Sequence, residues 1–217
     1  MIKNRTNLTL FSENESQGSK TQESSAKPNI IFILADDMGF GDLGFYGNSK
    51  VKTPVLDNLA SQSVCMSQHY SAAPVCAPAR AAFLTGRYPY RTGQDMSRKW
   101  RGISPKSKTI AQYFSNSDYA NALIGKWHLN GKPGCWTPPE NMPWNMGFNE
   151  CAMIPPFSDY WDWTMECKDG IYKKSDGRYL TDALTDEAIN FIERHENENF
   201  FLFLAYNAPH YPLQARK

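Results

Sequence analysis

The sequence places a thiol and a guanidinium four residues apart at the start of a short helical segment. Pro78 suits the first turn of a helix, the residues up to Leu84 are good helix formers, and Gly86 suits its end. Cys76 is then expected at the N-terminus of this helix, with Arg80 about one turn further on. The unpaired N–H groups of a first turn favour an anion, and Arg80 adds a fixed positive charge. This spacing predicts a reactive position beside a binding place for an anion.

Two adjacent carboxylates follow the first strongly apolar run of the chain. Residues 29–35 predict a central parallel strand covered on both faces, and Asp36 and Asp37 come directly after it. Ligands of open α/β sheets bind just past the carboxyl ends of the strands. Adjacent carboxylates repel each other unless a cation lies between them. The pattern alone is compatible with a metal site and also with a solvated acidic turn.

Two further apolar runs lead to basic or imidazole side chains. Residues 119–124 predict a strand that leads to Lys126 and His128, which point the same way if the segment stays extended. Residues 200–205 predict a buried strand that leads to His210. Because parallel strands end at one edge of a sheet, we expect these side chains to converge with the two carboxylates of the first strand.

Four stretches, taken in order, resemble the motifs of the sulfatase family. The segments that carry the resemblance are Pro-Asn-Ile-Ile-Phe-Ile-Leu-Ala-Asp-Asp-Met-Gly-Phe-Gly-Asp at 28–42, Cys-Ala-Pro-Ala-Arg-Ala-Ala-Phe-Leu-Thr-Gly-Arg at 76–87, Gly-Lys-Trp-His-Leu at 125–129 and Pro-His-Tyr-Pro at 209–212. Asn130 stands where the family usually has glycine. On these motifs the chain is identified as an arylsulfatase-like, formylglycine-dependent (type I) sulfatase of the alkaline-phosphatase-like superfamily.

The resemblance implies two cofactors. It implies that a formylglycine-generating enzyme oxidises Cys76 to formylglycine (3-oxoalanine), with Pro78 and Arg80 part of the motif recognised by that enzyme. The hydrated aldehyde would then attack the sulfur of a sulfate monoester. It also implies that Asp36 and Asp37, together with residue 76, bind a divalent cation, usually Ca²⁺, with Mg²⁺ as another choice.

The remaining roles are also implied by the resemblance. Arg80 and Lys126 would stabilise negative charge on oxygen, while His128 would handle the proton of the nucleophile. His210 would bind the sulfate group and assist the leaving oxygen. The expected substrate is a sulfated small molecule or carbohydrate, and the sequence does not choose between sugar, aryl and steroid esters.

The pattern predicts an α/β fold with a mostly parallel sheet flanked by helices. Residues 1–27 read as a disordered polar lead-in, and residues 28–217 as the N-terminal portion of a sulfatase catalytic domain. We expect helices near 54–60, 109–114 and 179–195, the first packed on the core, and a short strand at 65–71. Residues 130–169 predict an irregular excursion. Its tryptophans could line a cleft or, as we favour, pack together; they are Trp136, Trp144, Trp161 and Trp163.

Composition excludes several partners. The 217 residues are 41% hydrophobic and carry a net charge of +1. This charge is too small to indicate binding to nucleic acid or to an anionic membrane surface. The longest purely apolar runs have six residues, too few to span a bilayer. Five cysteines leave disulfides and buried thiols both open. No secretory signal is visible in the sequence, although members of the family that it resembles are often exported. The sequence therefore does not assign a cellular location.

The length of the chain leaves three functional readings open. In sulfatases a second pair of metal ligands, an Asp and an Asn, and a further lysine follow the Pro-His-x-Pro motif, whereas this sequence stops at Lys217. We therefore expect a truncated fold with an exposed apolar sheet edge and little or no turnover. One alternative is a metal-dependent phosphatase or phosphonate hydrolase of the same superfamily. The other is a non-catalytic sulfatase fragment.

Overall fold

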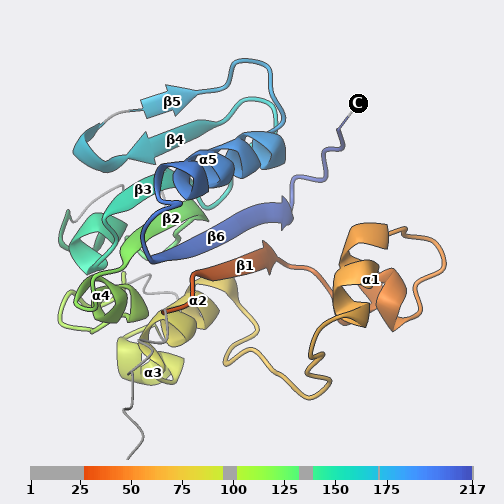
Figure 1. Ribbon diagram of the computed structural model, residues 1–217, viewed down its shortest axis with the longest axis horizontal. Coiled ribbons are helices and arrows are strands. Elements are labelled where there is room, and N and C mark those ends of the chain that lie inside the picture. Colours follow the sequence, from red (N-terminus) through yellow and green to blue (C-terminus); the bar gives the residue numbers. More distant parts are fainter. Residues whose placement is uncertain (1–26, 95–101, 132–138, 171, 217) are drawn as a thin grey trace, which may run out of the picture.

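A six-stranded sheet joins the segments of the chain that carry the predicted site residues (Figure 1). The computed structural model describes residues 27–94, 102–131, 139–170 and 172–216. The strands are β1 (Ile30–Asp36), β2 (Ala120–Lys126), β3 (Glu150–Ile154), β4 (Thr164–Cys167), β5 (Tyr172–Lys174) and β6 (Phe200–Pro209). The helices are α1 (Pro54–Ser61), α2 (Cys76–Thr85), α3 (Pro89–Thr92), α4 (Ile110–Ser115) and α5 (Leu180–Arg194). Of the expected lead-in at 1–27, residues 1–26 lie outside the described residues.

The sheet has the order β1-β6-β2-β3-β4-β5. The first four strands in this order, β1, β6, β2 and β3, are parallel to one another. Strands β4 and β5 extend the sheet beyond β3 with antiparallel pairing. The prediction of an α/β fold with a mostly parallel sheet is therefore confirmed. Helix α5 lies on one face of the sheet, and α2 and α4 lie on the other (Figure 1).

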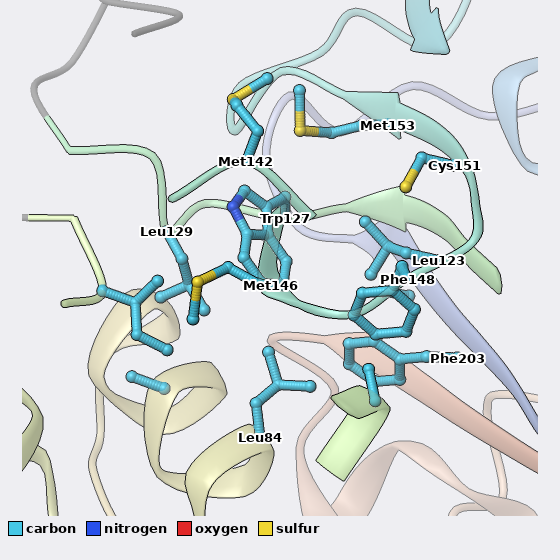
Figure 2. Packing of buried hydrophobic residues seen from close by; sticks show 14 of the residues in the cluster. Leu84, Leu123, Trp127, Leu129, Met142, Met146, Phe148, Cys151, Met153 and Phe203 are labelled. Carbon is cyan, nitrogen blue, oxygen red and sulfur yellow. The ribbon is translucent and has the colours of Figure 1, made fainter. Parts of the chain in front are cut away.

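The central strand β6 supplies both hydrophobic cores, because successive side chains of a strand point to opposite faces. Phe201 and Phe203 join α2, α4 and the Trp127 side chain in one core. Leu202 and Leu204 join α5 in the other. This two-sided burial explains why residues 200–205 are apolar without alternation. Figure 2 shows the first core, where Phe203 and Phe148 lie close together and Trp127 lies between Met142 and Met146.

Strand β1 departs from the expectation of a central strand covered on both faces. It is an edge of the described sheet, paired with β6 alone, and Ile31 and Ile33 are 48% and 60% exposed. Phe32 packs against Phe83 of α2 on the covered face. The expectation of an exposed apolar sheet edge is met among the described residues, where β1 pairs with β6 alone. The exposure of the face that carries Ile31 and Ile33 is a separate feature that was not expected.

Helix α1 forms as expected but does not pack on the core. Val55 is 79% exposed and Leu59 is 59% exposed, and Figure 1 shows α1 apart from the sheet, beyond the end of β1. The Asp57 carboxylate holds the helix start by accepting from the Thr53 hydroxyl at 2.8 Å and from the Phe45 N–H at 2.7 Å. Residues 65–71, expected as a strand, are irregular. The helical spacing of the apolar residues in α1 was predicted correctly, but the sequence did not show which element would cover them.

The region 130–169 is more regular than expected. Residues 132–138, including Trp136, lie outside the described part of the chain. Of the rest, Glu150–Ile154 pairs with β2 and Thr164–Cys167 pairs with β3. Strands of four or five residues are too short to show periodicity, which is why the sequence did not reveal them. Trp163 is 3% exposed inside the α5 core, and Trp144 and Trp161 pack against the cores, as favoured.

The described residues include four of the five cysteines of the chain. Cys65, Cys76, Cys151 and Cys167 are all free thiols there. None of the helices in the described ranges has the length and apolar character that crossing a bilayer requires.

Replacing Gly125 by alanine should destabilise the sheet strongly. Gly125 has φ of +106°, and a Cβ atom there would lie 2.0 Å from the carbonyl oxygen of Ala205 on β6. Backbone strain and overpacking together should lower the free energy of unfolding by about 3 kcal/mol or more. Gly177→Ala is the matched control, because its φ is +89° but nothing lies within 4 Å of the added carbon. Urea unfolding with equal losses for both variants would contradict the prediction.

Candidate active site

The ends of three parallel strands meet at one edge of the sheet. Strand β6 lies between β1 and β2, so Asp36 at the end of β1 and Lys126 at the end of β2 flank the same strand. His210 follows directly after β6. The convergence expected from the three apolar runs is therefore present in the structure.

Asp36 is the buried centre of this edge, with 4% of its surface exposed. One carboxylate oxygen accepts from Arg80 Nη2 at 3.1 Å, and the other accepts from Lys126 Nζ. Burial raises the pKa of Asp36, but the charges and hydrogen bonds of Arg80 and Lys126 outweigh burial and leave the pKa below its ordinary value. Arg80 Nη1 also donates to the carbonyl oxygen of Lys126 at 2.7 Å. One guanidinium thus joins α2 to the ends of β1 and β2.

Cys76 stands at the N-terminus of α2, as predicted, although the helix begins at Cys76 itself rather than at Pro78. Pro78 falls in the first turn, where its missing N–H leaves no bond unmade. Val75 before it is extended, and Gly86 ends the helix with φ of +63°. The Cys76 thiol is half-buried, and its sulfur lies 3.1 Å from Nδ1 of His128.

His128 is a neutral imidazole held beside that sulfur. It is 6% exposed, and burial first, then the positive charges of Lys126 and Arg80, lower its pKa to about 3. The segment is not extended as expected, because His128 has φ of +59°. This turn still brings Lys126 and His128 to one side, while Trp127 between them enters the core and donates to the Asn141 carbonyl at 3.0 Å. A neutral imidazole in this place can accept a hydrogen bond from a group at position 76.

Asp37 and His210 form the more open side of the cluster. Nε2 of His210 lies 3.6 Å from Oδ2 of Asp37, and the two side chains are 13% and 64% exposed. Asp37 has φ of +64°, which turns the chain away from β1 immediately after Asp36. All seven predicted residues thus belong to one cluster, linked by contact, by sequence adjacency or by the charge interaction of Lys126 with His128.

The described residues supply only part of a calcium site. Carboxylate oxygens have the right donor chemistry, but Ca²⁺ takes six to eight oxygens. Both oxygens of Asp36 already pair with cationic side chains. No group of three or more His, Cys, Asp or Glu side chains in the described ranges is arranged to hold a metal. Asp36 and Asp37 therefore do not fit a complete cation site by themselves.

Sequence reasoning missed two aromatic residues at the site. The Phe157 ring, in the loop between β3 and β4, lies 5.8 Å from the Lys126 ammonium and 5.9 Å from the His210 ring. The Tyr160 hydroxyl donates to the His210 carbonyl at 2.9 Å. The one signal in the sequence is the pair Pro155-Pro156, which marks a fixed turn directly after an apolar run.

The fold and the site together define an α/β protein of the alkaline-phosphatase-like sulfatase type. A family model described as Sulfatase matches residues 28–217. The chain is 33% identical to human N-acetylgalactosamine-6-sulfatase over 219 residues, which cover 88% of this chain and 41% of that protein. It is 48% identical to human arylsulfatase D over 111 residues, 47% of this chain and 19% of that one.

Solved structures agree in fold. The crystal structure of Ps i-CgsB in complex with k-i-k-neocarrahexaose matches with a TM-score of 0.78 and 35% identity, over 88% of this chain and 47% of that chain. The structure of BT4656 with its substrate D-glucosamine-2-N,6-O-disulfate matches with a TM-score of 0.72 and 28% identity, over 85% and 35%. The chain belongs to the sulfatase family, and it spans less than half the length of these relatives.

Replacing Asp36 by asparagine should destabilise the fold, because two buried cations would lose their shared carboxylate. Breaking a buried ion pair by removing one partner costs about 3–5 kcal/mol. Asp37→Asn is the matched control and should change the free energy of unfolding by less than about 0.5 kcal/mol, since its side chain is mostly exposed. Urea unfolding at pH 7 measures both variants, and a loss under about 1 kcal/mol for Asp36→Asn would contradict the prediction.

The same carboxylate should make stability depend on acid. A lowered pKa in the folded state means that the contribution of Asp36 is fully present above its ordinary pKa of 3.8 and is lost as pH falls through the folded value. The stability gap between wild type and Asp36→Asn should therefore stay constant from pH 7 to about pH 5 and shrink below about pH 4. Urea unfolding across this range measures it, and a gap that widens on acidification would refute the assignment.

Proposed function

We propose that this chain carries residues for the hydrolysis of sulfate monoesters, with Cys76 as the residue converted to formylglycine. One observation carries the proposal: Cys76 stands at the N-terminus of α2, 3.1 Å from a neutral His128 and one turn before Arg80. Membership of the sulfatase family supports the general reaction. The formylglycine, the divalent cation and the roles of single residues belong to the proposal.

Each proposed role follows from position. A formylglycine at position 76 would supply a hydrated aldehyde as the nucleophile, in place of a thiol whose sulfur adduct would be too stable. His128 would handle the proton of the nucleophile through a hydrogen bond at Nδ1, the atom that faces residue 76. Lys126 and Arg80 would place positive charge next to the sulfate oxygens. His210 would donate a proton to the leaving oxygen from the open side.

The cation is the least complete part of the proposal. Asp36 and Asp37 would supply carboxylate oxygens to Ca²⁺ or Mg²⁺, and the further oxygen ligands would be the Asp and Asn that sulfatases carry after the Pro-His-x-Pro motif. We therefore expect the 217-residue chain alone to hydrolyse sulfate esters slowly or not at all. Sulfated carbohydrates are the favoured substrate class, because Ps i-CgsB was solved with k-i-k-neocarrahexaose and BT4656 with a glucosamine disulfate.

The modification itself is the first test, because it needs no turnover. We expect the chain, co-produced with a formylglycine-generating enzyme, to lose the sulfur of Cys76 and gain an aldehyde in the peptide mass spectrum. Arg80→Ala should reduce the conversion, since Arg80 belongs to the recognised motif. Arg91→Ala, in the nearby helix α3, is the control and should convert like the wild type. An unmodified Cys76 under these conditions would overturn the proposal.

The reaction class is tested by paired esters of one phenol. Any hydrolysis should be faster for the aryl sulfate than for the aryl phosphate, and Cys76→Ala should abolish it. Lys126→Ala should lower the rate by about 10²–10³-fold, the effect typical of removing one group that stabilises developing charge. A circular-dichroism melt of each variant separates loss of chemistry from loss of fold. Faster phosphate hydrolysis would instead assign the chain to the phosphatase alternative.

A further inference from the structure

The Phe157 ring is exposed although it lies among three site residues. It is 60% exposed, and its centroid lies 5.8 Å from the Lys126 ammonium, 5.8 Å from the His128 ring and 5.9 Å from the His210 ring. An aromatic ring of this size usually gains by burial, so its outer face is apolar surface offered to solvent beside charged and polar groups.

The loop that carries Phe157 is fixed to the strand that leads to His210. The Ser158 carbonyl accepts from the amide of Asn207 on β6 at 3.3 Å. The Tyr160 hydroxyl donates to the His210 carbonyl at 2.9 Å. Both anchors lie within three residues after Phe157 in the sequence, and Ser158, Tyr160 and Asn207 are each more than nine-tenths buried. The position of the ring relative to His210 is therefore set by the fold.

Burial in the site decreases toward Phe157. Arg80 and Lys126 have almost no exposed side-chain surface, whereas His210 is 13% exposed and Asp37 is 64% exposed. If a sulfate group meets the buried cations, its organic group would extend toward the more exposed side, where His210 and Phe157 lie. It would then lie against the outer face of the ring.

We propose that Phe157 determines specificity for the organic group of the ester, by stacking on an aryl ring or on the C–H face of a sugar ring. The inference rests on the proposed sulfatase function. Stacked rings favour binding by roughly 2- to 12-fold beyond simple burial, which sets the expected size of the effect. An ester with a small alkyl group would not gain this contact.

Binding, measured without turnover, tests the inference. In the Cys76→Ala background, NMR titration compares methyl sulfate, phenyl sulfate and N-acetylglucosamine 6-sulfate. We expect the two ring-bearing esters to bind more tightly than methyl sulfate. Phe157→Ala should weaken them by roughly 3- to 10-fold and leave methyl sulfate unchanged. Tyr113→Ala on α4, an aromatic residue 61% exposed, is the matched control and should change nothing.

The outcomes separate this inference from the function on which it rests. Methyl sulfate binding without a ring preference, or equal losses for all three esters in Phe157→Ala, would overturn the role of Phe157 and leave the sulfatase proposal standing. No binding of any sulfate ester would overturn both. Phe157→Leu keeps an apolar side chain without a ring, and full retention of the ring preference in that variant would also contradict stacking. A preference of phenyl over sugar ester, or the reverse, identifies which ring the face accepts.

Discussion

The pairing of one buried carboxylate with two buried cations is the constraint on which the site depends. Removing three charged groups from water costs several kcal/mol for each ion, so the arrangement survives only because each charge is paired. Asp36 ends β1, Lys126 ends β2, and Arg80 lies on α2, so a single carboxylate fixes three elements at once. The guanidinium strengthens the junction through the Lys126 carbonyl. This junction also fixes the position of Cys76, because Cys76 lies one turn before Arg80 on the same helix.

The segment after β2 couples the core to the site. Trp127 is 1% exposed in the core, while Lys126 before it and His128 after it face the site. The bulk of the indole and its hydrogen bond to Asn141 fix the backbone on which both polar side chains stand. Gly125 lets β2 approach β6 closely enough for this packing, since no side chain fits against Ala205. The chemistry of the site thus depends on apolar packing that carries no charge.

The sequence predicted the polar cluster better than the surface of the fold. Apolar runs ending in Asp36, Lys126 and the segment before His210 were sufficient, because parallel strands must end at a common edge. The exposure of Ile31 on β1 and of Val55 on α1 could not be predicted, because an apolar pattern shows which face seeks cover but not which element supplies it. Short strands such as β3 and β4 are set by pairing with neighbours rather than by periodicity.

Phe157 was also missed, because no motif surrounds it and its place depends on anchors that are distant in sequence, such as Asn207. The two buried cations of the site differ in how many hydrogen-bond donors they have and in which groups those donors bond. Lys126 has three donors and one bonds Asp36, so in the proposed function the amine keeps two donors for an ester oxygen without losing its bond to the carboxylate. Arg80 has five N–H donors, and the two that bond Asp36 and the Lys126 carbonyl fix the cluster. In the proposed function, charge recognition belongs to the buried side of the site, and discrimination between organic groups belongs to the exposed aromatic side.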